Sequence, residues 1–407
     1  MKIQSEEYWR WIEDNRENDP TKLRLKLHGS DNIEAYNSAI TQIVCRKKCA
    51  LKLADTLKAA EHFFFPSEIS AEMSTSDVIA RIHASLIPSG STVVDLTAGL
   101  GIDVFTLARK AAKAVAVEIN ADAAAALKYN ADVLGLSNVE VIHSDCEDFL
   151  RQLNDGEMYD VAFIDPARRS DNGDRVYALS DCKPDVTELL PLIQKHFRTL
   201  IVKASPMLDI SALANALPGC TEIIIPGTTT ECKELVAVIN LSEPYNIPYA
   251  IKAVTVNRKE VISEFEFTPE QEKAAAVSYA PPAAGEFLYE PYPALMKSGG
   301  MRILASKLNL QKLHPNTHLF TSAEYCASFP GDIFEIIEAL PYASKHIKRL
   351  SSRYPVINVS ARNFKLSAAE LAKKLGVKTG GDLRLFGCVN YKDERMIIIC
   401  KPAEVQP

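Results

Sequence analysis

A row of carboxylates runs through the middle of the chain, and each one follows a short apolar stretch. Asp95 ends the first stretch, and the chain then passes through Thr97, Gly99 and Gly101 into the periodic segment DVFTLARKAA. This order predicts a buried parallel strand, a tight glycine turn and a helix. Glycines let the backbone approach a ligand without an intervening Cβ, and the start of a helix offers unpaired N–H groups. We therefore expect a ligand to bind at this turn.

Three further acids occupy the same place after the next apolar stretches, namely Glu118, Asp145 and Asp165. In an open α/β sheet, the C-terminal ends of parallel strands meet at one edge, and ligands bind there. Four carboxylates at this edge favour a cationic ligand with a ribose and an adenine over a ligand with a pyrophosphate. The dinucleotide fingerprint is also incomplete, because Val104 stands where its third glycine or alanine would be. The alternative is that the acids are solvated caps of the strands.

The stretch from Val93 to Asp165 resembles the class I S-adenosylmethionine-dependent methyltransferases. In that family, a D-x-x-x-G-x-G loop holds the methionine part of the cofactor, and acids after the second and third strands bind its ribose and adenine. The resemblance implies S-adenosyl-L-methionine as the cofactor, bound by Asp95, Gly99, Gly101, Glu118 and Asp145. It extends the cofactor site to Thr97, Asp103, Ile119, Cys146 and Asp165. For Cys146, a packed thiol is the alternative.

A cluster of hydroxyl groups lies upstream of the glycine turn, at Ser74, Thr75 and Ser76. Each of these residues is a candidate N-cap for the helix predicted in DVIARIHASLI. In many nucleic-acid methyltransferases, a segment at this place folds over the carboxylate of the cofactor. The resemblance therefore assigns Ser74 and Thr75 to the cofactor site, with a plain helix cap as the alternative.

The segment DPARR, which begins at Asp165, is the candidate catalytic motif. It resembles the family's fourth motif, (D/N/S)-P-P-(Y/F/W/H), whose first side chain and a backbone carbonyl accept the hydrogens of an amino nitrogen. The nitrogen lone pair then faces the methyl carbon, so the protein mainly has to align the two partners. Asp165 and Pro166 match the motif, whereas Ala167 replaces the second proline and Arg168 replaces the aromatic residue. Asp165, Pro166 and Arg168 are the candidate catalytic residues.

A D-P-P-R variant of this motif is found in enzymes that methylate carbon 5 of RNA pyrimidines, and these enzymes need a cysteine nucleophile after the next strand. The matching segment here, Lys203-Ala204-Ser205-Pro206, contains no cysteine. Serine does not replace a thiolate without an activating base. N-methylation is therefore the favoured reaction. Arg168 and Arg169 are expected either to bind a phosphate or carboxylate or to form a structural ion pair.

Length and composition restrict the class of protein. The 407 residues exceed one ordinary core, and 47% apolar against 24% charged residues are typical of globular proteins. No apolar run is long enough to cross a bilayer, and the N-terminus lacks the apolar segment of a signal peptide. The nine cysteines form no C-x-x-C pair and the eight histidines are dispersed, so we expect reduced thiols and no metal site. A cytoplasmic protein of undetermined oligomeric state is expected.

The order of apolar patterns divides the chain into four regions. Residues 1–62 are predicted to be helical, with a short extended piece at Leu23, Leu25 and Leu27 and with the aromatic docking anchors Tyr8, Trp9 and Trp11. Residues 63–242 alternate between strand and helix, which predicts a Rossmann-like α/β domain with the seven-stranded sheet of class I methyltransferases. Residues 243–318 are predicted to be a linker with a small ferredoxin-like α+β region, and residues 319–407 a small α+β module that closes with a hairpin.

Charge is distributed unevenly along the chain. The net charge is −6, yet Pro341 to Lys401 contains thirteen Lys or Arg and four acids, a balance of +9 that leaves −15 for the remainder. A basic module on an acidic body is typical of contact with a polyanion. The tail resembles the THUMP-like module joined to a class I methyltransferase in one bacterial family, and THUMP domains deliver RNA to attached enzymes. The candidate RNA-binding residues are Lys345, Lys348, Arg349, Lys373 and Lys374. The alternative is a solvated basic face.

These patterns predict an S-adenosylmethionine-dependent methyltransferase that acts on a tRNA or rRNA base, with N-methylation favoured and with the C-terminal module bound to the RNA. Two alternatives stay open. One is a protein that binds the cofactor and RNA with little catalysis, because the fourth motif departs from the family pattern. The other is a methyltransferase of a protein or a small molecule.

Overall fold

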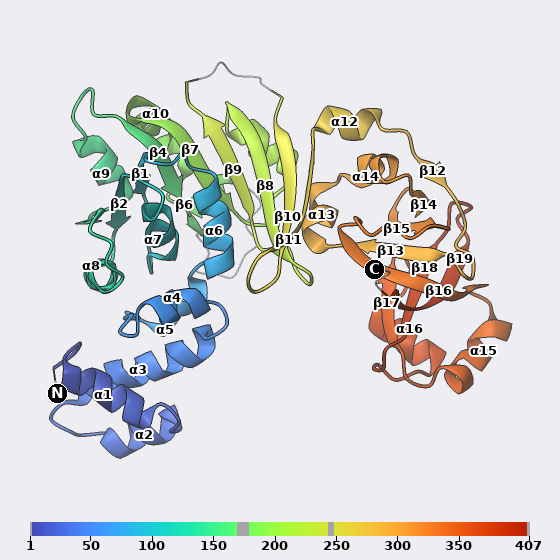
Figure 1. Cartoon of the computed structure of the whole chain (residues 1–407), viewed down its shortest axis with the longest axis horizontal. Helices are drawn as coiled ribbons and strands as arrows, with labels where there is room; N and C mark the ends of the chain where they lie inside the picture. Colours follow the sequence, from blue (N-terminus) through green and yellow to red (C-terminus); the bar gives the residue numbers. More distant parts are fainter. Residues whose placement is uncertain (1, 169–178, 243–247, 405–407) are drawn as a thin grey trace. The chain divides into compact units, whose positions relative to one another are not determined.

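The structure is a computed structural model that describes residues 2–168, 179–242 and 248–404, apart from the side chains of Arg168 and Lys348. The chain forms two compact units (Figure 1). The first unit comprises Met1–Ile223, Glu234–Ile247 and Arg258–Glu260, and the second comprises Ile224–Lys233, Pro248–Asn257 and Val261–Pro407.

The first unit begins with a helical region, as predicted. Its helices are α1 (Glu6–Asn15), α2 (Pro20–Leu27), α3 (Ile33–Cys49) and α4 (Ala54–Ala59), followed by α5 (Glu68–Met73) and α6 (Asp77–Ser85). The predicted extended piece at Leu23, Leu25 and Leu27 is wrong, because these leucines lie in α2. Asp19 caps this helix by accepting the N–H of Lys22.

The aromatic residues of α1 anchor the helical region to the sheet domain, as predicted. Tyr8 is fully buried, Trp9 is 5% exposed, and both pack in one apolar cluster with Ile40 of α3. Trp9 Nε1 donates a hydrogen bond of 3.1 Å to the hydroxyl of Tyr129 on helix α8 (Ala121–Val133). A buried indole with a satisfied N–H fixes the position of one helix on another.

The sheet of this region has the Rossmann-like order of a class I methyltransferase, which confirms the predicted fold. Its strands follow the order β11-β10-β8-β9-β7-β4-β1-β2-β3. The strands β1 (Thr92–Asp95), β2 (Lys113–Glu118), β3 (Val139–His143), β4 (Tyr159–Ile164) and β7 (Phe197–Ala204) are parallel, and β9 (Leu235–Asn240) is antiparallel to β7. The connections include α7 (Ile102–Ala108), α9 (Cys146–Gln152), α10 (Val186–His196), α11 (Ile210–Ala216), the two-residue strands β5 (Ala167–Arg168) and β6 (Cys182–Lys183), and the short helix η1 (Leu179–Asp181).

The predicted seven strands are present, but the sheet contains nine strands in the part of the chain that the structure describes. The hairpin of β10 (Ala250–Val256) and β11 (Val261–Phe267) adds two strands beyond β8 (Cys220–Thr228). Alternating residues in β11 leave one face polar, which is the pattern of an edge strand of an antiparallel pair.

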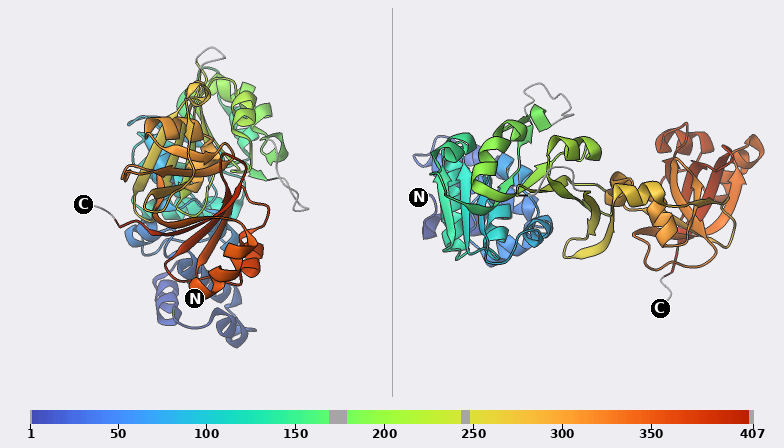
Figure 2. Two further views of the ribbon diagram at one scale, coloured as in Figure 1. Left: turned by 90° about the vertical axis from the view of Figure 1, so that its right-hand side faces the viewer. Right: turned by 90° about the horizontal axis from the view of Figure 1, so that it is seen from above.

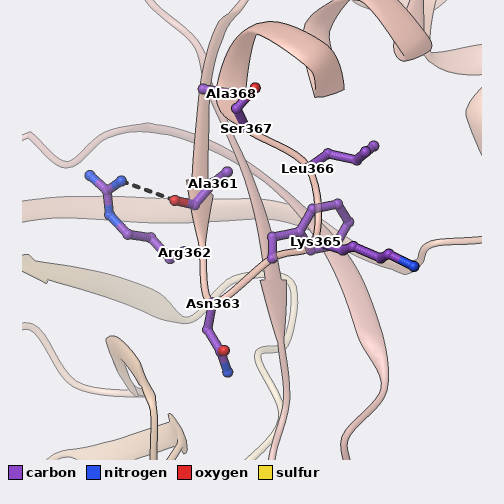
Figure 3. Close-up of a pocket in the computed structure, with 8 residues that line it drawn as sticks. Ala361, Arg362, Asn363, Lys365, Leu366, Ser367 and Ala368 are labelled. Carbon is purple, nitrogen blue, oxygen red and sulfur yellow. Dashed lines mark hydrogen bonds between the residues drawn. The ribbon is translucent and has the colours of Figure 1, made fainter.

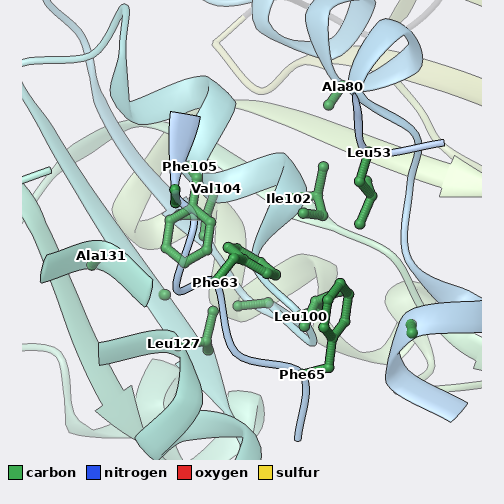
Figure 4. Packing of buried hydrophobic residues seen from close by; sticks show 14 of the residues in the cluster. Leu53, Phe63, Phe65, Ala80, Leu100, Ile102, Val104, Phe105, Leu127 and Ala131 are labelled. Carbon is green, nitrogen blue, oxygen red and sulfur yellow. The ribbon is translucent and has the colours of Figure 1, made fainter. Parts of the chain in front are cut away.

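An apolar cluster packs against the glycine turn (Figure 4). Leu100, Ile102 and Phe105 from the turn and α7 pack there with Leu127 of α8 and Phe63. A Cβ on Gly101 would lie 2.4 Å from Leu127 Cδ2, and the φ angle of Gly101 is +91°. Only glycine fits this position, because a side chain would meet both steric overlap and the left-handed backbone.

The second unit contains an eight-stranded sheet with the order β12-β14-β15-β13-β16-β19-β18-β17. Its strands are β12 (Ser278–Tyr279), β13 (Phe287–Pro291), β14 (Gln311–His314), β15 (Thr317–Ser322), β16 (Gly331–Pro341), β17 (Asn358–Arg362), β18 (Arg384–Val389) and β19 (Arg395–Pro402). Its helices are α12 (Pro269–Ala274), α13 (Pro293–Ser298), α14 (Met301–Lys307), α15 (Ser344–Arg353) and α16 (Ala368–Leu375). The boundary predicted between residues 318 and 319 lies inside β15.

Alternate residues of β18 and β19 face two apolar clusters in this unit. Phe386 and Ile398 pack with Phe334 in one cluster, whereas Leu385 and Ile399 pack in the other with residues of α15 and α16. The two views of Figure 2 show α15 and α16 beside the strands coloured red. The closing hairpin of β18 and β19 is present as predicted.

Candidate active site

The four carboxylates of the sequence pattern lie at the C-terminal edge of the parallel strands. Asp95 and Glu118 are the last residues of β1 and β2, Asp165 directly follows β4, and Asp145 lies shortly after β3. Asp95 is 1% exposed and accepts the N–H of Thr97 at 3.1 Å. Burial, together with the nearby carboxylate of Asp103, raises the pKa of Asp95 well above its ordinary range.

The glycine turn is tied to the second strand through Glu118. One carboxylate oxygen of Glu118 accepts the N–H of Gly99 and the other accepts the N–H of Asn120, both at 2.8 Å. Each oxygen keeps a second lone pair that can accept a hydroxyl hydrogen. A Cβ on Gly99 would have only the carbonyl oxygen of Thr97 near it, at 4.0 Å, so the space above this residue is open. An open cradle beside an acid that can hold a ribose fits S-adenosylmethionine.

The remaining predicted cofactor residues differ in what they offer a ligand. Ile119 is 64% exposed beside Glu118, which gives an apolar surface of the kind that an adenine ring packs against. Asp145 is the N-cap of α9 and uses one oxygen on the N–H of Glu147. The Ser74 hydroxyl donates to the carbonyl of Ala71 at 3.0 Å. Burial raises the pKa of Cys146 to about 12, so that this residue is a packed thiol.

Thr75 and Asp103 belong to a buried cluster of charged groups. Asp103 Oδ1 lies 2.7 Å from His83 Nδ1, and Asp103 Oδ2 accepts the Thr75 hydroxyl at 2.5 Å and the Lys203 ammonium at 3.3 Å. Glu234 Oε1 lies 2.6 Å from the other ring nitrogen of His83, and its Oε2 lies 3.8 Å from Lys203 Nζ. Both oxygens of Asp103 are therefore occupied by partners inside the protein.

Mutual attraction keeps this cluster ionised in spite of its burial. Burial alone would lower the pKa of His83, but Asp103 and Glu234 outweigh it and raise that pKa to about 9. Burial opposes the charge on Lys203 as well, and the same two carboxylates with Asp165 raise its pKa well above the ordinary value. Against the cost of their own burial, Lys203 and His83 lower the pKa of Asp103 and that of Glu234. At neutral pH the cluster contains two cations and two buried anions.

The loop that begins at Asp165 joins this cluster to the edge of the sheet. The Asp165 N–H donates to the Thr97 hydroxyl at 2.7 Å, and Asp165 Oδ2 accepts the Lys203 ammonium at 2.6 Å. The Asp165 side chain is 45% exposed, whereas Pro166 is buried. The backbone of Arg168 pairs with Cys182 in the small β5–β6 sheet. The Arg168 side chain and Arg169 lie outside the described residues.

Three residues of the cluster, His83, Lys203 and Glu234, were not among the sequence candidates. Each stands next to apolar residues, in DVIARIHASLI, TLIVKAS and ELVAVIN respectively. A charged residue inside an apolar element needs a partner of opposite charge. The position of these three residues beside apolar residues therefore indicates that they form buried ion pairs. Strand order supplies the pairing, because Ile164 lies opposite Val202 and the following residues, Asp165 and Lys203, are therefore neighbours.

The candidate RNA-binding residues lie on two adjacent helices of the second unit. Lys345 and Arg349 are exposed on α15, and Lys373 and Lys374 are exposed on α16, which contacts α15. The ammonium of Lys374 lies 5.5 Å from the ring centroid of Tyr342. The Lys348 side chain lies outside the described residues. All five predicted residues thus lie on one pair of helices, and the four whose side chains are described are exposed.

An open cavity of about 660 Å³ adjoins α16 (Figure 3). It is lined by residues 361–368, including Arg362, Asn363 and Lys365. The Arg362 guanidinium is held by Glu290 through contacts of 2.6 and 2.7 Å and by the carbonyl of Ala361 at 3.1 Å. The charge of Arg362 is therefore paired, and Lys365, which is exposed, is the other cation that lines the cavity.

The described residues hold no group of three or more His, Cys, Asp or Glu arranged to bind a metal ion. Among the helices of this described part, none combines the length and the apolar character needed to span a membrane.

Family profiles match three consecutive parts of the chain. Residues 80–179 match the family described as conserved hypothetical protein 95, residues 287–330 match a ferredoxin-like domain, and residues 331–402 match a THUMP-like domain.

Known proteins resemble the chain over different lengths. An uncharacterised RNA methyltransferase of Synechocystis sp. is 28% identical over 162 residues, which are 39% of this chain and only 33% of that relative. An uncharacterised S-adenosylmethionine-dependent methyltransferase of Mycobacterium tuberculosis is 23% identical over 75% of this chain and 79% of its own length. A crystal structure of a "putative methyltransferase" from Porphyromonas gingivalis W83 is 30% identical and covers 99% of this chain and 100% of its own, with a TM-score of 0.87. The chain belongs to the family of class I S-adenosylmethionine-dependent methyltransferases that carry a C-terminal THUMP-like domain.

Proposed function

We propose that the protein methylates a nitrogen of a base in tRNA or rRNA, and that its C-terminal module holds the RNA. The observation that carries the proposal is the position of Asp165. Its carboxylate is fixed at the cofactor edge of the sheet through one oxygen, and the side chain is 45% exposed, so the other oxygen can meet a substrate. The RNA part is supported by the name of the Synechocystis relative, by the THUMP-like match and by the cations on α15 and α16.

In this proposal the residues at the C-terminal edge of the parallel strands bind different parts of the cofactor. S-adenosylmethionine supplies a methyl group on a cationic sulfur, which is reactive without further activation. In this proposal Glu118 accepts the ribose hydroxyls, and Asp95, which lies beside the glycine turn, meets the amino group of the methionine part. Ile119 offers its apolar side chain to the adenine. These roles require no movement of the glycine turn, because Gly99 leaves the space above it open.

Asp165 and Pro166 orient the base in this proposal. Asp165 Oδ1 accepts one hydrogen of an amino nitrogen and the carbonyl of Pro166 accepts another, so that the nitrogen lone pair is aimed at the methyl carbon. As the new nitrogen–carbon bond forms, the carbon–sulfur bond breaks and its electron pair stays on sulfur. The nitrogen then releases a proton to water at the exposed side of Asp165. Alignment of this kind supplies most of the rate enhancement that such a transfer needs.

Substitution of Asp165 tests the proposal directly. The substrate is total RNA from a strain that lacks the gene, incubated with methyl-labelled S-adenosylmethionine and digested to nucleosides for mass spectrometry. We expect Asp165→Ala to reduce methylation of the RNA by about 100-fold or more, with the dissociation constant of the cofactor unchanged within about twofold. Asp155→Ala, which removes an exposed acid from the loop before β4, is the matched control and should retain full activity.

The outcomes separate the proposal from its alternatives. Equal methylation of RNA by the parent and Asp165→Ala would remove the catalytic assignment. Label that enters protein or small molecules but never RNA would overturn the substrate class. Tight binding of cofactor and RNA without any transfer would favour a binding protein whose fourth motif no longer supports catalysis.

A further inference from the structure

We propose that Lys203 is a positioning residue for the methyl transfer, which acts on the reaction only through Asp165. The inference rests on the proposed function, because it assumes that Asp165 orients the substrate nitrogen. It adds a residue that was not among the candidate site residues of the sequence, together with the network of buried groups that keeps this residue in place.

All three protons of the Lys203 ammonium are used inside the protein. The ammonium donates to Asp165 Oδ2 at 2.6 Å, to the Thr75 hydroxyl at 2.8 Å and to Asp103 Oδ2 at 3.3 Å. A lysine has three N–H donors and no acceptor. Lys203 is also only 5% exposed, so a substrate cannot reach its ammonium. Its influence on the reaction must pass through one of these three partners.

Two of the partners form a rigid support, and the third faces the substrate. Thr75 donates its own hydrogen to Asp103, and Asp103 is held on its other oxygen by His83, which is fully buried. Glu234 closes the ring by contacting His83 and by lying 3.8 Å from Lys203 Nζ. Asp165, by contrast, is half-exposed at the edge of the sheet. Thr75 and Asp103 therefore fix the ammonium, which donates its remaining hydrogen to Asp165.

This contact selects the rotamer of the Asp165 carboxylate. Its backbone N–H is bound to Thr97 and its Oδ2 to Lys203, so both ends of the residue are fixed before any substrate arrives. Oδ1 is then the oxygen left for the substrate nitrogen. The family's fourth motif offers an aromatic ring for stacking, whereas this chain has Arg168 there and instead anchors the acid itself. A fixed acceptor supplies part of the alignment that the missing ring would have given.

Removal of Lys203 alone would leave an excess of buried negative charge, so the test uses a charge-balanced pair of variants. With Asp165 counted as a carboxylate, the parent cluster has the cations His83 and Lys203 and three anions. The double variant Lys203→Met/Glu234→Gln keeps the same net charge of the cluster, because one cation and one anion are removed together. The single variant Glu234→Gln retains the contact between Lys203 and Asp165 and is the matched control.

The kinetic arm compares turnover with cofactor affinity. We expect the double variant to lower kcat for RNA methylation by about 10-fold or more, with the dissociation constant of S-adenosylmethionine unchanged within about twofold. Glu234→Gln should lower kcat less than the double variant does, because Glu234→Gln retains the contact between Lys203 and Asp165. In an Asp165→Ala background, the loss of Lys203 should have no further effect on kcat, because Lys203 acts only through the Asp165 carboxylate. Additive losses would overturn the proposal.

A second arm needs no substrate and detects the contact itself. In protein labelled with ¹³C at the aspartate carboxyls, the Asp165 signal is assigned by its disappearance in Asp165→Asn. Its titration midpoint should rise by about 1 unit or more in the double variant relative to Glu234→Gln, since an opposite charge within this distance lowers a carboxyl pKa by that amount. An equal midpoint in the two variants would refute the role of Lys203 even if Asp165 proves catalytic. If Asp165→Ala leaves methylation intact while the midpoint shifts, the proposed function fails and the contact stands.

Discussion

A histidine enclosed between two carboxylates is a cation at neutral pH, and His83 is placed in this way. Its side chain is fully buried, with Asp103 at 2.7 Å on one ring nitrogen and Glu234 at 2.6 Å on the other. Both nitrogens therefore donate, which only the protonated ring can do. Because the two carboxylates also contact Lys203, the proton on His83 keeps them in place behind the proposed active site.

Stability should therefore fall as the solution becomes alkaline. The folded pKa of His83 is about 9, against an ordinary value of 6.5, so its contribution is complete below pH 6.5 and is lost as pH rises through 9. A shift of this size corresponds to a loss on the order of 3 kcal/mol in the free energy of unfolding. Urea unfolding at pH 6, 7.5 and 9 measures this loss.

Two variants show whether His83 is the responsible group. His83→Gln should be less stable than the parent at pH 6 and should show a smaller decline between pH 6.5 and pH 9. His28→Gln removes an exposed histidine and should decline as the parent does. An unchanged slope in His83→Gln would mean that another group causes the pH dependence.

The sequence allows some residues of the site to be predicted, whereas others become neighbours only through the tertiary fold. Asp95 and Glu118 could be placed because each ends an apolar run, and strand direction then sets them on one edge. His83 and Glu234 could not be paired, since they are 151 residues apart and meet only when the sheet is complete. Lys203 also follows an apolar run, but its three partners come from three other segments of the chain.

At the scale of elements, the glycine turn joins β1 to α7 above the cluster that contains Leu127. Gly101 has no room for a methyl group, since its Cβ would lie 2.4 Å from Leu127 and 2.6 Å from Phe105. We expect Gly101→Ala to cost about 2–5 kcal/mol in unfolding free energy, from left-handed backbone strain and overpacking together. Cofactor affinity should fall as well, because α7 would be displaced from β1. Urea midpoints and calorimetric titration with S-adenosylmethionine measure the two effects.

A second glycine separates strain from overlap. Gly135 also has a left-handed φ angle, +69°, but a Cβ there would have no atom within 4 Å. Gly135→Ala should cost only about 1–2 kcal/mol, which is the strain alone, and should leave cofactor affinity unchanged. Equal destabilisation by the two substitutions would show that close packing under the turn has no effect on stability.

The spacing of apolar residues predicted most elements, but it failed in one segment whose leucines have the spacing of a strand and lie in a helix. The strands of the parallel sheet are short runs of apolar residues bounded by turns, which is the pattern of a buried strand. In α2, however, Leu23, Leu25 and Leu27 alternate as in a strand, yet the segment is helical. The Asp19 cap and Pro20 at the first turn decide the outcome, together with the burial of Leu23 against α1 and α3.

At the scale of the whole chain, the C-terminal module cannot be removed cleanly at residue 331. The strand β16, which begins at Gly331, pairs with β13 over residues 287–291. A deletion of residues 331–407 would expose the edge of β13 and the buried residues Leu288, Leu313 and Leu319, which belong to the same apolar cluster as Phe334. Loss of RNA binding in such a truncated protein would therefore not distinguish the removal of an RNA-binding surface from the disruption of the sheet.

Neutralisation of the cations on α15 and α16 is the sharper test of RNA binding. Lys345, Arg349, Lys373 and Lys374 are exposed, so their replacement by glutamine leaves the core intact. If each binds a phosphate, the quadruple variant should bind RNA more weakly at low salt. The slope of log K against log salt concentration should become less negative by about 1 for each phosphate-binding cation that is replaced, up to about 4. Filter binding with total tRNA between 50 and 300 mM salt, roughly the range where such interactions are screened, measures the slope.

The matched control removes the same charge from dispersed sites. Lys22, Lys58, Lys128 and Lys273 are also exposed, and their replacement by glutamine changes the net charge equally. A general electrostatic attraction would weaken RNA binding to the same extent in both variants, because only the total charge would matter. A specific surface on α15 and α16 predicts a smaller salt slope for the first variant alone. Equal slopes in the parent and both variants would place the RNA contact elsewhere and leave the basic module as a solvated face.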